Sequence, residues 1–410
     1  MYDVIIVGAG IAGLRIGLAL IHRGIRCAIV ERYSYTGGRI LTYHHKVPYR
    51  GDVQWESGAG RISSSHHKTM TLLRQYHLTT IPIDNESDYL AQRQEPNPFY
   101  SLQSVYMEPL KKLPPSVLQS HTLYEVLTMI HGKKAAQFSH MFPYYSEIHT
   151  MRADAALLSF QGEMGDHQHF VVCKEGLSSL TKRMHEEFLE MGGEMLYGKE
   201  VEGVRMIEES LYRLDIKKQD PLFAKLCVMA LHRDAVAHIR GLSNLPVLSK
   251  LKMMPLYRMY AVFDRPWFKN LPKIVTPGPI RYIIPIDPSK GVIMISYTDG
   301  KDASYWMKQS PMETERNVMK EIRRLFPERT IPDPVFFKMH PWESGCTYWL
   351  PGPYSIKEES KKSLQPLPDS MPGVFLCGES FAVQPCWIES AVEQADRVLA
   401  HPAFRAMISI

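Results

Sequence analysis

The sequence predicts a mixed α/β protein organised around a parallel sheet. A continuous β-branched run at residues 4–7 predicts a strand buried on both faces, and a second run at residues 26–30 follows after a helical pattern. Further short apolar runs occur near the middle and the end of the chain. With 410 residues, of which 45% are apolar and 22% charged, the composition is that of a globular protein with two or three structural units.

Composition and charge exclude several classes of protein. The six cysteines are scattered without a C-x-x-C pair, so we expect no zinc ribbon or disulfide framework and a reducing, cytoplasmic location. The net charge of +5 without a long basic block does not favour nucleic acid. No targeting or membrane segment stands out, so we expect no membrane partner. The pairs His66-His67 and His167-x-His169 lack a third ligand, and we expect no metal site.

Three glycines follow the first strand at the spacing G-x-G-x-x-G. Gly8 permits the tight turn, Gly10 lets the backbone approach a pyrophosphate, and Gly13 lets the helix pack closely on the strand. The helix N-terminus offers unpaired N–H donors to phosphate, and Gly24 can end this helix with a positive φ. Glu31 ends the second strand, where its carboxylate can bond the ribose hydroxyls of an adenosine. A plain glycine-rich turn does not explain that acid, so the unit predicts a dinucleotide site.

The residues after Glu31 favour FAD over NAD. Gly37-Gly38-Arg39 forms a loop able to pass close to the pyrophosphate, where a plain NAD domain would enter a crossover helix. With its G-x-G-x-x-G, its acid and its G-G-R, the sequence resembles the flavin-containing amine oxidase family of monoamine, polyamine and L-amino-acid oxidases. The resemblance implies that these glycines, Glu31, Gly38 and Arg39 bind FAD.

Separate segments continue the resemblance in the family's order. Gly58 and Gly60 belong to a segment that runs under the flavin ring in the family. Residues 170–180 resemble the start of the third strand of the FAD domain, and an amphipathic helix follows from Leu177. Val201 stands in a strand whose valine touches the adenine side of FAD in relatives. Residues 228–231 and 373–379 resemble two further buried strands, and residues 387–391 resemble a helix start.

The fold that this resemblance implies is a Rossmann-like, discontinuous FAD-binding domain with an inserted α+β substrate-binding domain. We assign residues 1–65, 166–245 and 342–410 to the FAD-binding domain, and residues 66–165 and 246–341 to the substrate-binding domain. Residues 85–115, rich in Pro, Gln and Ser, predict a long surface excursion of the latter.

The C-terminal segment carries residues expected at the flavin ring. Gly378-Glu379 follows a strand, and the Glu379 carboxylate would accept hydrogen bonds from the ribityl chain. A helix that begins near Trp387-Ile388 would aim its N-terminus at the N1–C2=O edge, where reduced flavin is negative. The ordinary alternative for Glu379 is a solvated acid after a strand.

The resemblance also implies an aromatic slot for the substrate. Trp387 occupies the column of one wall of the family's cage. Thr347 stands at the other wall, where Tyr348 or Trp349 could substitute, unless the cage is half open. Trp342 packs either near the flavin or in an ordinary core.

Two residues have open roles. Cys346 occupies the column where monoamine oxidases link a cysteine to flavin through a thioether, but an unreacted small residue is the favoured alternative. Arg61 resembles the arginine that clamps the substrate carboxylate in L-amino-acid oxidases, and it could equally contact FAD or an internal acid.

Arg258 is the main departure from the family. Relatives carry a lysine there, which holds a water at flavin N5 and assists the reaction with oxygen. Arginine keeps the charge, but its planar fork holds water differently and does not readily deprotonate. The sequence therefore leaves open whether O2 is the electron acceptor.

The function implied is that of an FAD-dependent oxidoreductase. It would oxidise the C–N bond of an amine or L-amino acid to an imine by hydride transfer to flavin N5, with reoxidation by O2 giving H2O2. A desaturase or porphyrinogen-oxidase-like enzyme, or a flavin-binding protein with a decayed site, remain as alternatives, the latter supported by Arg258 and Thr347. The expected partners are a small-molecule amine or amino acid and molecular oxygen, and a homodimer is left open.

Overall fold

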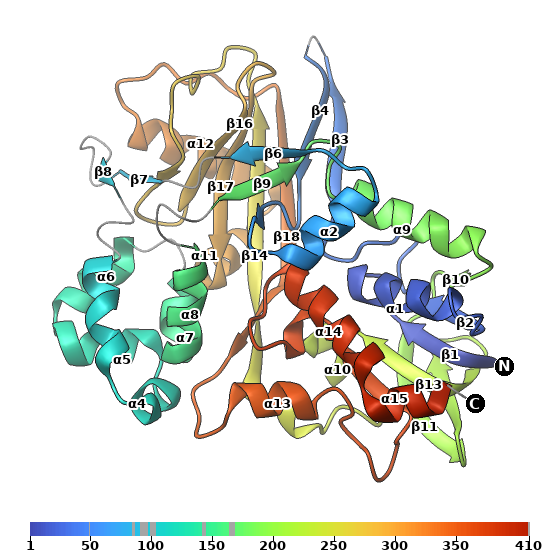
Figure 1. Ribbon diagram of the computed structural model, residues 1–410. Helices are drawn as coiled ribbons and strands as arrows, with labels where there is room; N and C mark the ends of the chain where they lie inside the picture. The colour runs from blue at the N-terminus through green and yellow to red at the C-terminus, as the bar shows by residue number, and fades with distance from the viewer. Residues whose placement is uncertain are drawn as a thin grey trace.

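The computed structural model describes residues 1–48, 50–83, 87–90, 97–98, 104–141, 145–163 and 169–408. In these residues two seven-stranded sheets form the body of the protein, and a helical lobe lies beside the second sheet (Figure 1). Two smaller sheets of two and three strands complete the β structure of this part of the chain.

The first sheet contains the predicted βαβ unit. Its parallel strands are β10 (Glu194–Leu196), β2 (Cys27–Val30), β1 (Tyr2–Val7), β13 (Leu222–Ala230) and β19 (Val374–Cys377). β11 (Val201–Glu208) and β12 (Leu211–Ile216) extend it as an antiparallel hairpin beside β13. Because the parallel strands run in one direction, the chain leaves them at one common edge, where ligands bind in open α/β sheets.

Helices cover one face of this sheet because their apolar stripes face it. α1 (Ile11–Ile21), α9 (Ser178–Glu190) and α14 (Ile388–Ala400) share one buried cluster with β1 and β2, and α1 lies beside α14 (Figure 1). As predicted, Gly24 follows α1 with φ +74°, and the Ile25 N–H bonds the Leu20 carbonyl. Two helices lie next to α14, namely α2 (His67–Gln75) and α15 (Pro402–Ile408).

One expected strand belongs to a different sheet. β9 (Phe170–Cys173) pairs with β5 (Ile62–Ser63) and β6 (Thr80–Ile83) in a three-stranded antiparallel sheet, whereas β10 is the strand that pairs with β2. The prediction that this segment starts the third strand of the FAD sheet was therefore wrong. A short apolar run predicts a buried strand but does not indicate which strand it pairs with. The helix expected after it is confirmed as α9, with Leu180, Met184 and Phe188 buried.

The second sheet is built on two long strands, β14 (Leu251–Val262) and β18 (Phe336–Trp349). It continues through β17 (Val292–Asp299), β16 (Tyr282–Asp287), β15 (Ile274–Val275), β7 (Asp88–Tyr89) and β8 (Asn97–Pro98). α11 (Gly300–Met307) and α12 (Pro311–Leu325) pack on it, and the hairpin of β3 (Thr42–Val47) and β4 (Gly51–Glu56) contacts it through Trp55. β18 runs through the domain boundary expected at residue 342, and the boundaries themselves stay a prediction.

The helical lobe covers one end of the second sheet. It comprises η1 (Glu108–Lys112), α4 (Pro115–Ser120), α5 (Leu123–His131), α6 (Lys134–Met141), α7 (Tyr145–Thr150) and α8 (Ala153–Glu163). Part of the excursion expected at residues 85–115 lies outside the described residues, and its described part includes the buried Met107 and Leu110. No helix in the described ranges combines the length and apolarity needed to cross a membrane.

Four short elements occur where the chain passes between the two sheets or leaves the last strand of the first sheet. They are α10 (Arg233–Ala237), η2 (Pro246–Lys250), α13 (Ile356–Lys362) and η3 (Glu379–Phe381). η3 contacts both β18 and α14, so the chain that follows the last strand of the first sheet reaches the second sheet directly.

Candidate active site

The glycine turn after β1 has the geometry that its spacing predicts. Gly8 has φ +107°, and a Cβ on Gly13 would lie 2.0 Å from the Gly8 carbonyl oxygen. A side chain is therefore excluded at both positions. A Cβ on Gly10 would meet no atom of the described residues within 4 Å, so the backbone there faces open space. This is the arrangement that a pyrophosphate at the start of α1 requires.

The G-G-R loop lies directly beside this turn. Gly37 N–H donates to the Ala9 carbonyl at 2.9 Å, and Gly10 and Gly37 form an isolated β-bridge. Gly37 and Gly38 both have positive φ, and an added Cβ on Gly38 would lie 3.6 Å from Gly10 Cα. Two glycine turns from separate segments thus approach each other closely.

Glu31 is fixed at the same edge by two backbone amides. Its Oε2 accepts the Ala9 N–H at 2.9 Å, and its Oε1 accepts the Tyr33 N–H at 2.9 Å. Val201, at the start of β11, lies close by, since the Lys199 N–H bonds the Glu31 carbonyl at 3.0 Å. Beside Glu31 a concavity of about 350 Å³ is lined by Arg32, Tyr33, Gly198, Glu200 and Lys217.

Arg39 connects this region to the end of the chain. Its Nη2 lies 2.6 Å from Glu379 Oε1, and its Nη1 donates to the Gly345 carbonyl at 3.1 Å. Gly378, with φ +117°, places Glu379 at the end of β19. Burial raises the pKa of the Glu379 carboxyl, but the Arg39 guanidinium and the Cys386 N–H outweigh it and hold this pKa below its ordinary value.

Thr347 belongs to the hydrogen-bond network of Glu379. Its hydroxyl donates to Glu379 Oε1 at 3.0 Å and lies 2.7 Å from the Ser380 hydroxyl. Trp349 is fully buried and donates from Nε1 to the Ala382 carbonyl, whereas Tyr348 bonds Ser146 and Asp299. The alternation of a strand explains this split. Thr347 and Trp349 therefore make their contacts within the core, and the Trp387 ring packs against other residues.

Trp387 packs against residues from three separate segments of the chain. It precedes α14 as its N-cap, with Ile388 buried behind it, and its ring lies 4.7 Å from His66 and 6.3 Å from Phe170. The Arg61 guanidinium stacks over Phe170 at 4.7 Å and over Trp387 at 5.6 Å. The structure thus brings Arg61 and Trp387 together. The sequence indicated His66 only as one of a histidine pair and Phe170 only as the start of a strand, because neither segment shows which residues it contacts.

The loop at residues 57–60 passes between Trp342 and Arg258. A Cβ on Gly58 would lie 2.0 Å from the Arg39 carbonyl oxygen, and Trp342 Nε1 donates to the Ser57 carbonyl at 2.6 Å. Arg258 Nη1 donates to the Glu56 carbonyl at 3.1 Å and also to the Gly58 carbonyl, while a Cβ on Gly60 would lie 3.4 Å from it. Arg258 therefore holds this loop by its backbone.

Glu56 is the acid of the segment that resembles the family's acid-x-G-G motif, and the sequence did not indicate how it titrates. Burial raises its pKa to about 7, even though the Leu177 N–H and the Thr42 hydroxyl donate to its carboxylate at 2.7 and 2.9 Å. The Arg258 guanidinium lies over the Tyr297 ring at 4.7 Å. Its positive charge opposes the effect of burial and lowers the pKa of Glu56. A carboxyl that titrates near neutrality thus lies under the glycine loop.

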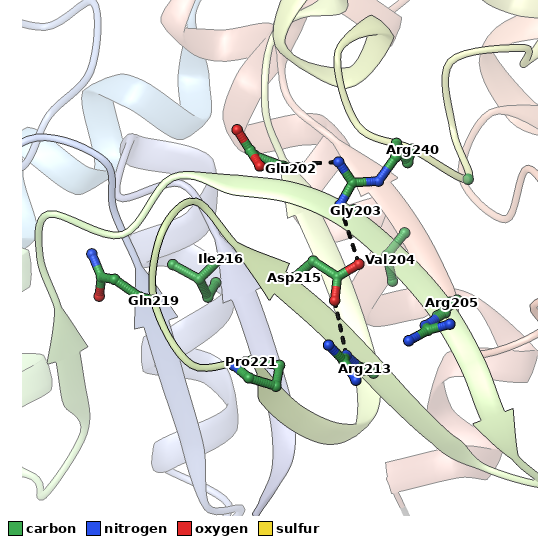
Figure 2. A pocket seen from close by; sticks show the side chains of 11 residues that line it. Glu202, Gly203, Val204, Arg205, Arg213, Asp215, Ile216, Gln219, Pro221 and Arg240 are labelled. Atoms are coloured by element: carbon green, nitrogen blue, oxygen red, sulfur yellow. Dashed lines mark hydrogen bonds and ion pairs between the residues drawn. The ribbon is translucent and has the colours of Figure 1, made fainter.

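Two further features are the position of Cys346 and a concavity on the β11–β12 hairpin. Cys346 is buried in the cluster between β18 and the helical lobe. A concavity of about 540 Å³ lies on the β11–β12 hairpin, where Arg213 and Arg240 pair with Asp215 (Figure 2). None of the predicted site residues lines this concavity.

No group of three or more metal-ligating side chains occurs in the described ranges, and His167 lies outside them.

Comparison with known proteins gives a consistent result. Residues 132–399 match the family described as flavin containing amine oxidoreductase, and residues 3–43 match an FAD binding domain. The flavin-containing amine oxidase of Danio rerio is 29% identical over 86 residues, which are 21% of this chain and 16% of that protein. A putative L-amino-acid oxidase, YobN of Bacillus subtilis (strain 168), is 30% identical over 77 residues, or 19% of this chain and 16% of that protein. These alignments thus span a small part of each relative.

Solved structures match over the whole fold. A mutant of putrescine oxidase from a structure-based redesign of its cofactor binding has a TM-score of 0.78 at 16% identity, covering 100% of this chain and 99% of that one. Cyclohexylamine oxidase from Brevibacterium oxydans IH-35A has a TM-score of 0.76 at 18% identity, with the same coverage. These matches confirm the two-domain α/β fold, and both family matches support FAD as the cofactor. Because the amine oxidoreductase match at residues 132–399 spans well over half of the sequence, the chain belongs to the flavin-containing amine oxidoreductase family.

Proposed function

We propose that this protein oxidises the C–N bond of a small-molecule amine or L-amino acid to an imine, which water then hydrolyses. The observation that carries the proposal is the cluster of Trp387, Phe170, His66 and Arg61 at the N-terminus of α14, next to the Glu379 network. The named activities of putrescine oxidase and cyclohexylamine oxidase, which share the fold, agree with it.

The residues of the dinucleotide edge fit FAD. A pyrophosphate would suit the open space at Gly10 and the unpaired N–H groups in the first turn of α1. A ribose would suit the carboxylate of Glu31 at the same edge. When bound, FAD would accept a hydride equivalent from the substrate C–H at N5 and pass the electrons to O2 as H2O2. Gly38, Arg39, Gly58, Gly60, Trp342 and Glu379 would then surround its middle part.

The protein's own residues position the substrate and exclude water from it. The N-terminus of α14, at Trp387 and Ile388, offers a positive dipole end to a developing negative charge. The half-buried Trp387 offers an apolar face that holds the neutral amine form, and the buried Phe170 supports it from behind. Arg258 holds the loop at residues 57–60 in place, and we assign it this positioning role.

Arg61 decides between the two substrate classes. A guanidinium stacked on two aromatic rings has its planar fork fixed in orientation, which suits bidentate binding of a carboxylate. We therefore propose that Arg61 binds the carboxylate of an amino-acid substrate, and that a simple amine would bind without it.

A single anaerobic experiment tests the proposal. Purified protein reconstituted with FAD is mixed without air with a panel of diamines, monoamines and L-amino acids, and flavin bleaching is recorded. We expect bleaching by at least one class, followed by recovery of colour and formation of peroxide when air is admitted. Absence of bleaching by every member of the panel, with FAD bound, would favour a desaturase-like enzyme or a binding protein instead. Bleaching without recovery in air would point to another electron acceptor.

A further inference from the structure

The β11–β12 hairpin has one buried face and one charged face. Val204 and Leu214 pair across the hairpin, and both are buried in the core of the first sheet. Arg205 pairs directly opposite Arg213 at the next register position, so these two side chains leave the hairpin on its other face. Both arginines line the concavity of about 540 Å³ that lies on this face (Figure 2).

A third arginine reaches the same face from the neighbouring segment. Arg240 lies beside β11, where its backbone forms a parallel bridge with Gly203. Its Nη2 lies 3.2 Å from Asp215 Oδ2, and Arg213 Nε donates to Asp215 Oδ1 at 2.8 Å. A Cβ on Gly203 would lie 3.1 Å from Asp215 Oδ2 and 3.2 Å from Arg240 Nη2, so the glycine leaves the room in which these side chains meet.

The carboxylates of this face do not neutralise its arginines. Both oxygens of Asp215 already accept a bond, one from Arg213 and one from Arg240. Glu202 lies 4.0 Å from Arg240 Nη1. Within the part of the chain that the structure describes, Arg205 makes no ion pair, and Figure 2 shows its guanidinium beside the concavity without a partner. The positive charge that remains is therefore at Arg205 and Arg213.

This arrangement suits a bound anion. Like charges directly opposite each other on paired strands are destabilising, and an anion between Arg205 and Arg213 would remove their repulsion. A phosphate group carries about two negative charges near neutral pH, and planar guanidinium forks bind its oxygens in pairs. The volume of the concavity lies within the roughly 300–1,000 Å³ of small-molecule sites, and Ile216 and Pro221 add apolar contacts beside the arginines (Figure 2).

We propose that Arg205, Arg213 and Arg240 form a binding site for a small molecule that carries a phosphate group, separate from the dinucleotide edge. The phosphate oxygens accept hydrogen bonds from the guanidinium groups of Arg205 and Arg213. Asp215 keeps Arg213 and Arg240 in place, and the rest of the ligand lies over the apolar side chains that line the concavity. The site does not depend on the proposed amine oxidation.

Titration calorimetry of the full-length, FAD-reconstituted protein at low ionic strength tests the proposal. The probes are inorganic phosphate and phenyl phosphate, and FAD is bound first so that the dinucleotide edge is occupied. We expect one site per chain for both probes, tighter binding of phenyl phosphate because of its apolar ring, and weaker binding of both at high salt. Phenol, which lacks the phosphate group, should not bind.

Three variants assign the site to these residues. Arg205→Gln should lower the affinity for phosphate by about tenfold or more, and Arg205→Lys, which keeps the charge without the planar fork, should recover part of it. Without phosphate, Arg205→Gln should melt at the same temperature as the unmodified protein or at a higher one, because it removes a repulsion. Arg316→Gln removes the same charge from an exposed position on α12 and should bind phosphate as the unmodified protein does.

Four results would overturn the proposal. They are the absence of binding heat with both phosphate probes, equal affinity in Arg205→Gln and the unmodified protein, and release of FAD by phenyl phosphate, which would place the probe at the dinucleotide edge. The fourth is Arg205-dependent binding to phosphatidylserine vesicles that inorganic phosphate does not displace, because it would assign this face to a membrane surface.

Discussion

Arg39 and Glu379, which lie near opposite ends of the chain, form an ion pair with 2.6 Å between Nη2 and Oε1. Arg39 follows the two glycines of the G-G-R loop, and Glu379 follows the last strand of the first sheet. Through the Gly345 carbonyl the same guanidinium also contacts β18 of the second sheet. One side chain thereby joins the dinucleotide edge, the C-terminal segment and the second sheet.

Replacing Arg39 should destabilise the protein and weaken FAD binding together. In Arg39→Ala the Glu379 carboxylate stays buried without its cation, and removal of one partner of a buried pair costs about 3 kcal/mol. The free energy of unfolding in urea and the FAD content after dialysis measure the two effects. Arg39→Lys keeps the charge and should recover part of the stability. Unchanged stability in Arg39→Ala would contradict the role given to this pair.

Gly10→Ala and Gly13→Ala should separate cofactor binding from folding. The Gly13 variant should lose stability, because its Cβ would lie 2.0 Å from the Gly8 carbonyl oxygen. The Gly10 variant should fold normally, but its methyl group occupies the space meant for the pyrophosphate, so we expect FAD affinity to fall by about tenfold or more, equivalent to at least ~1.4 kcal/mol. Thermal unfolding of the apoprotein and FAD titration by fluorescence check both outcomes. Equal FAD affinity in Gly10→Ala and the unmodified protein would place the cofactor elsewhere.

Arg258→Lys should change the reaction with oxygen more than the reaction with substrate. The family resemblance implies a lysine at this position. Arg258 bonds both the Glu56 and the Gly58 carbonyl from its Nη1 alone, which an Nζ could replace, but lysine lacks the planar guanidinium that lies over the Tyr297 ring. We expect faster reoxidation by O2 and a loss of about 1 kcal/mol in stability, because the contact with Tyr297 is lost. Separate stopped-flow measurements of flavin reduction and reoxidation distinguish the two steps. Arg258→Met serves as the control without charge, and identical reoxidation in all three proteins would show that residue 258 does not affect the reaction with oxygen.

Arg61→Ala should discriminate between amino acids and simple amines. If Arg61 binds a carboxylate, kcat/KM for L-amino acids should fall by roughly 10- to 100-fold, a loss of about 1.5–3 kcal/mol for a charged hydrogen bond. Amines without a carboxylate should lose little. Arg61→Lys tests whether charge alone suffices. An equal loss for both substrate classes would instead mean that Arg61 supports the packing of Phe170 and Trp387.

Glu56 should make the protein less stable as the pH rises from about 4.5 to about 7. Its pKa in the folded state is raised from 4.5 to about 7 by burial, so across this range the unfolded chain ionises while the folded carboxyl stays protonated. The unfolded state then binds fewer protons, and the free energy of unfolding falls with pH by up to about 3 kcal/mol. Glu56→Gln should remove this part of the slope. Urea unfolding at several pH values makes the comparison, and parallel curves for the two proteins would contradict it.

Local features of the chain could be predicted because their causes are local. The spacing of Gly8, Gly10 and Gly13 implies a turn between a strand and a helix, and the structure has that turn with Gly8 at positive φ. The helix expected near Trp387 begins at Ile388 for the same reason, since a change from turn to helical periodicity is visible within a few residues.

The remaining arrangement depended on contacts between distant segments. The apolar run of β9 predicted a strand, but only its pairing with β5 and β6 decided its sheet. Thr347 and Cys346 are neighbours in sequence, yet Thr347 bonds Glu379 whereas Cys346 is buried against the helical lobe. His66 and Phe170 likewise reach Trp387 from two separate elements. Hydrophobic periodicity reports which residues are buried, whereas strand pairing and side-chain packing determine what each buried residue contacts.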